Sequence, residues 1–435
     1  MNLRSVQPPI LSPSPTSPPQ ANAQYSSRHP VQEMDSQIKT ATLKLLQYCE
    51  TEGWAGYDPY DALNSRVIEV LPLLNTKLLR LALTQALKRS PINLRRLALI
   101  PKTQNPKALA LFLSALLKLA DTGLIHREDL IEQMIDRLTE LRSSGSRYSC
   151  WGYSFAWQGR KVIVPRGAPN LVCTTFVAGA LLDCYEQRQD ERCLIMAVSA
   201  AEYLLSDLYW DDGRESGFSY PKPALRSEIH NANLLAAALL CRVSYYTGET
   251  KFLAPALKAA RYSAARQNAD GSWYYGEMAS QRWIDNFHSG YNLSGLRQIQ
   301  SYAVTNEFEE NIRRGFRFYR DHFFREDGAA RYFHDRTYPI DIHCVAQSIL
   351  TLLEFRDLDA GNVALANSVC QWAMKHMWDA RGFFYYRVLR SCTIRTSYMR
   401  WSQAWMLLAL SRMLSESKSV AGHLQSQDSP AFAKS

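Results

Sequence analysis

The stretch that decides the fold is Asp270-Gly271-Ser272-Trp273-Tyr274-Tyr275, a turn followed directly by aromatic residues. The arrangement occurs four times, and its glycines, 58, 57 and 54 residues apart, are Gly213, Gly271, Gly328 and Gly382. Some 15 to 20 residues after each turn, a polar pair opens an apolar stretch; the pairs are His230-Asn231, His288-Ser289, His343-Cys344 and Arg400-Trp401. Recurrence at a fixed spacing indicates a structural repeat.

Apolar stretches with hydrophobic residues three and four positions apart, the spacing of an α-helix, run through most of the chain. The clearest are Leu43–Tyr48, Leu78–Leu87, Ala108–Leu119, Leu130–Leu141, Val172–Tyr185 and Ala197–Leu208. Each repeat is therefore interpreted as a turn, an aromatic connector and a helical hairpin, which cannot bury both of its apolar faces alone. The long connectors recur at the same point of each repeat and should therefore all return to one face. We predict an all-α (α/α)6–7 toroid with inner helices, outer helices and one functional mouth at that face.

Earlier copies of the repeat are weaker. One begins at Trp151-Gly-Tyr-Ser-Phe155 and opens its helix at Asn170, and two more are predicted at Trp54-Ala-Gly-Tyr57 and at Asn105-Pro106. The toroid domain is predicted over residues 34–415. The flanking segments 1–33 and 416–435 are predicted to be disordered tails, because they hold too few apolar residues to offset the entropy of folding.

The charge balance gives a weak indication of an acidic partner. Fifty Lys and Arg against 41 Asp and Glu leave a net charge of +9. Such an excess suits a uronate-bearing glycan, a phosphorylated substrate or an anionic membrane surface, but the surplus is spread along the chain as on an ordinary solvated surface. The basic residues form no stripe with a nucleic-acid-binding motif, so we expect no nucleic-acid partner.

The nine cysteines point to a reducing compartment, because their number is odd, no C-x-x-C pair occurs and most lie in apolar helical stretches. Zinc-ligand spacing is also missing, so neither a metal nor a cofactor is expected. The sequence has no apolar signal region and no apolar run long enough to span a bilayer. We therefore expect a cytoplasmic protein, and the sequence leaves its oligomeric state open.

The string Gln267-Asn-Ala-Asp270-Gly271-Ser-Trp273 resembles the Q-x-x-D-G-x-W repeat of terpene cyclases. In that α/α-barrel family the motif is structural, joining helices through the Gln side chain and a stacked Trp. The acidic Asp-x-Asp-Asp and Asp-Asp-x-x-Asp motifs of those enzymes are absent here. The zinc set of the prenyltransferase β-subunits is not apparent either. The resemblance therefore bears on the fold and not on the chemistry.

A second resemblance covers roughly residues 40 to 415. Gly53-Trp54-Ala-Gly-Tyr57-Asp58-Pro59-Tyr60-Asp61-Ala62-Leu63-Asn64 and Asp285-Asn286-Phe287-His288-Ser-Gly290-Tyr291-Asn292-Leu293 resemble poorly characterised proteins of bacterial exopolysaccharide gene clusters. Those belong to the six-hairpin-glycosidase-like superfamily, which also holds uronyl hydrolases, polysaccharide lyases and sugar epimerases. The resemblance implies a carbohydrate-handling role and supplies no catalytic set.

The connectors that precede the predicted inner helices should line the mouth. Asp285 and Glu228 are candidate acid/base groups or hydroxyl anchors, and His288 and His230 are candidate proton shuttles, because proton transfer on a glycan needs groups of these types. Arg226 or Arg400 would clamp a uronate. The substrate-binding candidates, which combine aromatic faces with polar groups, are Tyr291, Tyr275, Arg226, Asn231, His343, Asp341, Arg400 and Trp401.

A structural role is the alternative for several of these residues. Asp285 precedes a predicted helix and is a natural N-cap. His230 and His343 recur at helix starts, where they would lock neighbouring connectors together, and Tyr275 belongs to an aromatic run that suits packing.

Three functions stay open at this point. The first is an enzyme (hydrolase, lyase or epimerase) acting on a polysaccharide or its oligosaccharide precursor in polysaccharide biosynthesis or processing. The second is a non-catalytic glycan-binding or scaffold protein of a polysaccharide export system, which the missing nucleophile motif favours. The third is a terpene-cyclase-like or prenyltransferase-like toroid, which would need a deep apolar pocket.

Overall fold

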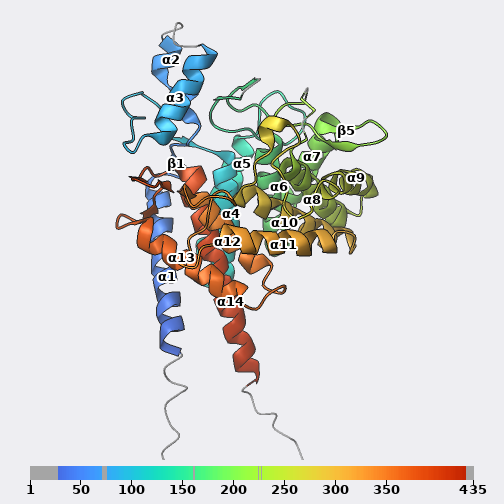
Figure 1. Cartoon of the computed structure of the whole chain (residues 1–435). Helices are drawn as coiled ribbons and strands as arrows, with labels where there is room; N and C mark the ends of the chain where they lie inside the picture. The colour runs from blue at the N-terminus through green and yellow to red at the C-terminus, as the bar shows by residue number, and fades with distance from the viewer. Residues whose placement is uncertain (1–27, 71–75, 160–161, 224, 227, 428–435) are drawn as a thin grey trace, which may run out of the picture.

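The computed structural model describes residues 28–70, 76–159, 162–223, 225–226 and 228–427 (Figure 1). In this part of the chain, six helices form an inner ring: α4 (Pro106–Asp121), α6 (Leu171–Arg188), α8 (His230–Thr247), α10 (Asn286–Ala303), α12 (Ile342–Glu354) and α14 (Ala404–Gln427). Each packs against the next, and α14 packs against α4, so the ring is closed. The predicted all-α toroid is confirmed.

Outer helices cover the inner ring: α1 (Arg28–Thr51), α5 (Glu128–Glu140), α7 (Glu191–Tyr203), α9 (Leu253–Ala264), α11 (Glu309–Phe323) and α13 (Asn362–His376). The sequence distinguishes the two sets. Helix α4 buries nearly every position, as an inner helix must, whereas α11 buries one face and leaves charged residues on the other. Helix α1 packs beside α14, so the first helix of the chain completes the last hairpin (Figure 1).

The structure has six hairpins and not seven. Strand β1 (Ala55–Gly56) pairs antiparallel with β2 (Thr103–Gln104), so the segment between them leaves the ring and returns to the same place. That insertion, residues 57–102, holds η1 (Asp61–Asn64), α2 (Arg66–Val70) and α3 (Lys77–Arg89), and it stands above the ring in Figure 1. The two weak copies predicted at Trp54 and Asn105 are therefore the two ends of one repeat.

The other connectors carry short antiparallel strand pairs and single helical turns. The pairs are β3 (Trp157–Gln158) with β4 (Ile163–Val164), β5 (Tyr209–Asp211) with β6 (Ser216–Phe218), β8 (Trp378–Asp379) with β9 (Phe383–Phe384), and β10 (Arg387–Val388) with both β7 (Ile340–Asp341) and β11 (Thr393–Ile394). The turns are η3 (Leu204–Leu208), η4 (Thr250–Phe252), η5 (Ala279–Gln281) and η6 (Met399–Gln403).

Polar residues cap the starts of the inner helices. The side chain of Asn170 accepts a hydrogen bond from the main-chain N–H of Cys173, and Asn105 caps α4 in the same way. Asp285 and Asp341 cap α10 and α12. Because a cap satisfies free amides at the helix start, the polar residues that recur before the inner helices have a structural role in most hairpins.

In three of the four aromatic turns the glycine packs on the next outer helix: Gly271 on α11, Gly328 on α13 and Gly382 on α1, whereas a Cβ at Gly213 would meet no atom within 4 Å. Gly382 has φ of 94°, and a Cβ there would lie 2.8 Å from the carbonyl oxygen of Lys44 in α1, which closes the ring. We expect Gly382→Ala to lower the free energy of unfolding by about 2 kcal/mol or more, because it adds backbone strain and a close contact.

Gly123 supplies the matched control for this prediction, since it has φ of 72° and no atom within 4 Å of the place that a Cβ would take. Gly123→Ala should cost only the backbone strain of about 1 kcal/mol. Urea unfolding of both variants measures the difference, and equal losses would contradict a close approach at the ring closure.

The terpene-cyclase-like string has the structural role that the sequence suggested. The amide of Gln267 donates to the carbonyl oxygens of Gly271 and Asn311, at 2.9 Å each, and so joins the turn to α11. The indole of Trp273 donates to the carbonyl of Ser263 at the end of α9. The motif thus links two successive outer helices.

Most of the two predicted tails lies outside the described residues, although α1 includes residues 28–33 and α14 continues to Gln427. Within the described residues, no helix has the length and apolar character needed to cross a membrane. The nine cysteines are unpaired, and all except Cys392 are buried.

Candidate functional site

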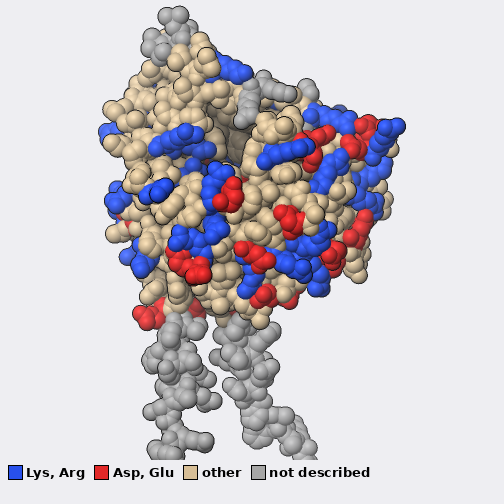
Figure 2. All heavy atoms as spheres, in the orientation of Figure 1, with Lys and Arg blue, Asp and Glu red and all other residues tan. Residues whose placement is uncertain are grey.

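The inner helices begin at the connector end of the ring, and Figure 2 shows a hollow at that end, between the insertion 57–102 and the connectors opposite. Five half-buried tyrosines, each from a different connector, surround this end of the ring: Tyr60, Tyr153, Tyr220, Tyr275 and Tyr332. Electrostatic interactions link Tyr60 to Tyr220, Tyr275 and Tyr332, and link Tyr153 to Tyr220. We call these five residues the tyrosine ring.

Burial keeps four phenols of the tyrosine ring protonated at neutral pH. Burial raises the pKa of Tyr220 to about 12 and raises the pKa values of Tyr153, Tyr275 and Tyr332 well above the ordinary value. Each of these hydroxyls can therefore both donate and accept a hydrogen bond, and each ring offers an apolar face.

Asp285 and His288 form a hydrogen-bonded pair beside the tyrosine ring. Asp285 is buried and accepts three hydrogen bonds: from the main-chain N–H of His288 at 3.0 Å, from the His288 Nδ1 at 2.7 Å and from the Trp283 indole at 2.9 Å. The imidazole of His288 packs on Tyr275 with ring centroids 4.5 Å apart, and 19% of its side chain is exposed.

The pairing defines what His288 can do. A neutral imidazole that donates from Nδ1 to a carboxylate presents an unprotonated Nε2, which can accept a proton. Within the described residues, this Nε2 has no hydrogen-bond partner. The predicted N-cap role of Asp285 is present, and the same carboxylate orients the imidazole.

His343 lies below this pair and is almost fully enclosed. Its ring stacks between Phe287 and Trp405, with centroids 4.6 Å away on both sides, and its Nε2 is 2.7 Å from the Tyr291 hydroxyl. Burial lowers the pKa of His343 well below its ordinary value, with a further contribution from Lys107. Because Phe287 and Trp405 cover both faces of its ring and Tyr291 occupies its Nε2, His343 supports the floor and holds Tyr291 instead of contacting a ligand directly.

The enclosed imidazole makes the fold sensitive to acid. The unfolded chain takes up a proton at His343 near pH 6.5 and the folded imidazole does not, so each pH unit below 6.5 favours unfolding by about 1.4 kcal/mol. We expect His343→Gln to lose less stability than the wild type between pH 6.5 and 5.5, by about 1 kcal/mol, because the unfolded imidazole is already half protonated at pH 6.5. Denaturant unfolding at the two pH values measures this, and identical losses in both proteins would contradict it.

Asp341 and Trp401, both predicted to bind substrate, form a hydrogen bond with each other. One carboxylate oxygen of Asp341 accepts from the Trp401 indole at 2.8 Å, and the other accepts from the Arg387 guanidinium at 2.6 and 2.8 Å. Asp341 has no exposed surface. Trp401 is also buried, although its ring meets Tyr60 edge-on at 5.6 Å.

Arg400, predicted as a uronate clamp, is neutralised within the protein. Its guanidinium makes two hydrogen bonds to Asp58, at 2.7 and 2.8 Å, and both side chains are more than nine-tenths buried. Beyond Asp58, the insertion carries a second buried pair, between Arg95 and Asp61 at 2.7 Å. The Asp58–Arg400 pair therefore fastens the insertion to the ring.

The hairpin of α8 holds the remaining catalytic candidates. Both ring nitrogens of His230 have partners, since Nε2 is 2.8 Å from the Glu277 carboxylate and Nδ1 is 3.3 Å from the Ser263 hydroxyl. The hydrogen bond to His230 lowers the pKa of Glu277. Glu228 is half-buried, and its carboxylate has no partner among the described residues.

Two predicted ligand-binding residues lie apart from the hollow or are enclosed. Arg226 is exposed, forms an ion pair with Asp212 at 2.7 Å and covers the face of Trp210, so it belongs to the β5–β6 hairpin. Asn231 is buried at the start of α8, where its side-chain oxygen lacks a hydrogen-bond partner among the described residues. In the described part of the chain, no three His, Cys, Asp or Glu side chains gather as a metal site would require.

The fold has clear counterparts among solved structures, although no family model and no curated protein matches the sequence. Cellobiose 2-epimerase from Bacillus thermoamylovorans is similar over 72% of this chain and 88% of its own, with a TM-score of 0.57 and 10% identity. The cellobiose 2-epimerase of Spirochaeta thermophila is similar over 73% of this chain and 87% of its own, with a TM-score of 0.55 and 13% identity. A GH76 α-mannanase from Bacteroides thetaiotaomicron is similar over 73% of this chain and 86% of its own, with a TM-score of 0.56 and 11% identity.

The chain is a six-hairpin toroid. The likeness confirms the predicted toroid fold, while the resemblance to exopolysaccharide-cluster proteins stays a prediction. At these identities the likeness concerns the fold of the toroid.

The sequence reasoning missed Lys107, at the start of inner helix α4 of the toroid. It is 2% exposed, and its ammonium lies 3.7 Å from the ring centre of Phe176, 5.5 Å from that of Tyr291 and 5.3 Å from that of Trp405. Two signals could have revealed it. Lys107 is a lysine at the start of a largely apolar inner helix, and it follows its cap Asn105 at the spacing at which His343 follows Asp341.

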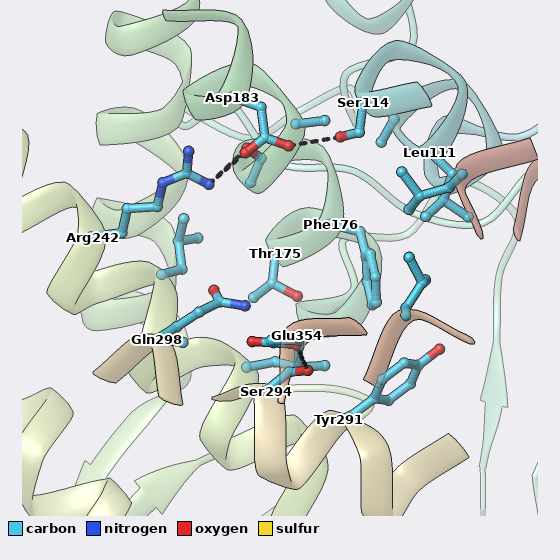
Figure 3. A pocket seen from close by; sticks show the side chains of 18 of the residues that line it. Leu111, Ser114, Thr175, Phe176, Asp183, Arg242, Tyr291, Ser294, Gln298 and Glu354 are labelled. Atoms are coloured by element: carbon cyan, nitrogen blue, oxygen red, sulfur yellow. Dashed lines mark hydrogen bonds and ion pairs between the residues drawn. The ribbon is translucent and has the colours of Figure 1, made fainter. Parts of the chain in front are cut away.

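The toroid is hollowed at its other end as well, where the sequence predicted no second mouth. A cavity of about 480 Å³ lies among the C-terminal halves of the inner helices (Figure 3). Asp183 stands on its wall and accepts hydrogen bonds from Ser114 and from Arg242, while Glu354 accepts from Ser294. Its deep end is formed by Phe176, Tyr291 and Trp405, the three rings that enclose Lys107.

Proposed function

We propose that this toroid is a carbohydrate-processing enzyme that holds a sugar in the tyrosine ring and uses His288 to transfer a proton. The observation that carries the proposal is the Asp285–His288 pair, because Asp285 holds His288 at Nδ1 while Nε2 has no hydrogen-bond partner among the described residues. Asp285 orients the imidazole and stabilises its protonated form, and Tyr275 supports its face.

The tyrosine ring supports a sugar as the ligand. A pyranose has apolar C–H faces and a rim of hydroxyls, and tyrosines offer aromatic faces together with hydroxyls that form hydrogen bonds. The fold adds to this support, since the similar solved structures include cellobiose 2-epimerases and an α-mannanase. The polysaccharide-biosynthesis setting rests on the sequence resemblance alone.

The state of the carboxylates favours proton transfer over hydrolysis. Hydrolysis by the usual mechanism needs two acidic groups that face the scissile bond, one as the acid and one as the base or nucleophile. Five carboxylates near the hollow each have a hydrogen-bonding partner: Asp58, Asp61, Glu277, Asp285 and Asp341. Glu228 alone among the predicted acids has no partner in the described residues, so a base such as His288 and one acid fit better than a carboxylate pair.

A thermal-shift screen of the purified protein tests the proposal. Neutral and uronate-containing mono- and oligosaccharides are added to the wild type, His288→Gln and Arg226→Met, whose side chain lies on the β5–β6 hairpin. A sugar at about 100 times its Kd stabilises the fold by about 2.7 kcal/mol, which raises Tm measurably. The proposal expects Arg226→Met to keep the shift, and the absence of a shift in wild type with every sugar would overturn it.

A further inference from the structure

We propose that Lys107 is the binding group for the carboxylate of an acidic sugar, so that the substrate class of this toroid is a uronate-bearing glycan. This inference rests on the proposed function, because it places the acidic sugar in the same hollow. It adds a recognition group that the sequence reasoning had not considered, in place of Arg226 and Arg400.

Lys107 lacks a counter-charge. In the described part of the chain, no oxygen atom hydrogen-bonds its ammonium, and it forms no ion pair. Two nearby groups that could compensate it do not. Asp58 is held by Arg400 through two hydrogen bonds, and the thiol of Cys173 stays protonated because burial raises its pKa to about 12. Burial lowers the pKa of Lys107 well below its ordinary value, and a bound carboxylate would restore the ammonium because it supplies the missing anion.

The surroundings of Lys107 favour an anion. The guanidinium of Arg400 is close enough to lower the pKa of Lys107, after the larger effect of burial, and His343 is neutral. Lys107 also lies in the first turn of α4, where the free N–H groups of the helix start add positive potential. A carboxylate bound here would supply the counter-charge that holds Lys107 protonated and would lie at a helix N-terminus, whereas a neutral hydroxyl would supply no counter-charge.

Lys107 and His288 lie on the same aromatic residue. The ammonium is 5.5 Å from the ring centre of Tyr291, and the imidazole centre is 6.1 Å from it. A sugar ring that approaches Tyr291 can therefore direct its carboxylate to Lys107 while a ring carbon faces His288. The carbon next to a carboxylate carries the most acidic C–H of a uronate, so the two positions suit one substrate.

Binding of a matched pair of sugars tests the inference. Isothermal titration compares an oligosaccharide that ends in glucuronate with the same oligosaccharide ending in glucose, on wild type and on Lys107→Met, whose side chain has a similar length and no charge. Lys118→Met, at the other end of the same helix, is the control. We expect the wild type and Lys118→Met to bind the glucuronate form at least tenfold more tightly, and Lys107→Met to lose that preference while it binds the glucose form as before.

The outcomes separate the two claims. If Lys107→Met keeps the full preference for glucuronate, the carboxylate site is wrong and the proposed function stands. If wild type binds both sugars equally, the acidic substrate class is wrong as well. If wild type binds neither sugar, the proposed function fails and the carboxylate site fails with it. Circular dichroism of Lys107→Met shows whether the variant is folded, and Lys107→Gln replaces it if it is not.

Discussion

Replacement of His288 by glutamine is expected to lower kcat for the sugar substrate by about 10³-fold, within the 10² to 10⁴ that a positioned acid or base contributes. Glutamine keeps a polar side chain near Asp285 and cannot exchange a proton at neutral pH. Binding should change little, because the tyrosine ring that holds the sugar is intact. Steady-state kinetics with the sugar found by the thermal-shift screen measure kcat and KM separately.

Two controls define what this loss means. His376 is exposed on outer helix α13, and His376→Gln should retain full activity. Asp285→Asn preserves the cap of α10 and removes the charge behind the imidazole, so it should lower kcat by less than His288→Gln does and leave KM nearly unchanged. If His288→Gln lowers activity only in proportion to a loss of folded protein, the imidazole has a structural role and the proposed chemistry is wrong.

The second large effect concerns stability. Arg400→Met leaves the carboxylate of Asp58 buried without its partner, so the free energy of unfolding should fall by about 3–5 kcal/mol. The ion pair fastens the insertion to the ring, and the loss should appear as a lower Tm and as early proteolysis within residues 57–102. Thermal unfolding followed by circular dichroism measures the first, and limited trypsin digestion the second.

The double variant Asp58→Leu/Arg400→Met distinguishes the interaction between the two residues from the separate contribution of each residue to stability. Because replacement of a buried ion pair by apolar residues is often nearly neutral, the double variant should be more stable than Arg400→Met alone. Losses that simply add would contradict a direct interaction and would assign the effect of Arg400 to its contacts with Tyr153 and Phe155.

The fold could be predicted because the repeat consists of residues that act on the local backbone, namely turn glycines and helix caps. All four glycines have a positive φ and three of them lie close to a helix, and polar residues that follow cap α10 and α12, so these features recur at the period of the hairpin. The number of hairpins was less certain, because the pairing of β1 with β2 across the insertion 57–102 leaves no periodic signal in the sequence.

The site was harder to predict because caps and functional residues share one phase of the repeat. Asp341 and His343 occupy the same positions relative to α12 as residues near the hollow do in other hairpins, yet the packing of Arg387, Trp401 and Trp405 encloses both. Only tertiary contacts tell these cases apart. Lys107 was missed for a different reason. Its helix, α4, belongs to the repeat that the insertion 57–102 interrupts, so the sequence does not show the usual spacing before it.

Incorporation of solvent deuterium into the sugar tests the central claim most directly. The wild type and His288→Gln are incubated with the sugar in D₂O, and NMR follows the carbon-bound hydrogens. Our account predicts exchange, epimerisation or elimination at one carbon with the wild type and a loss of about 10³-fold in rate with His288→Gln. Cleavage of a glycosidic bond without exchange, at equal rates in both proteins, would contradict it.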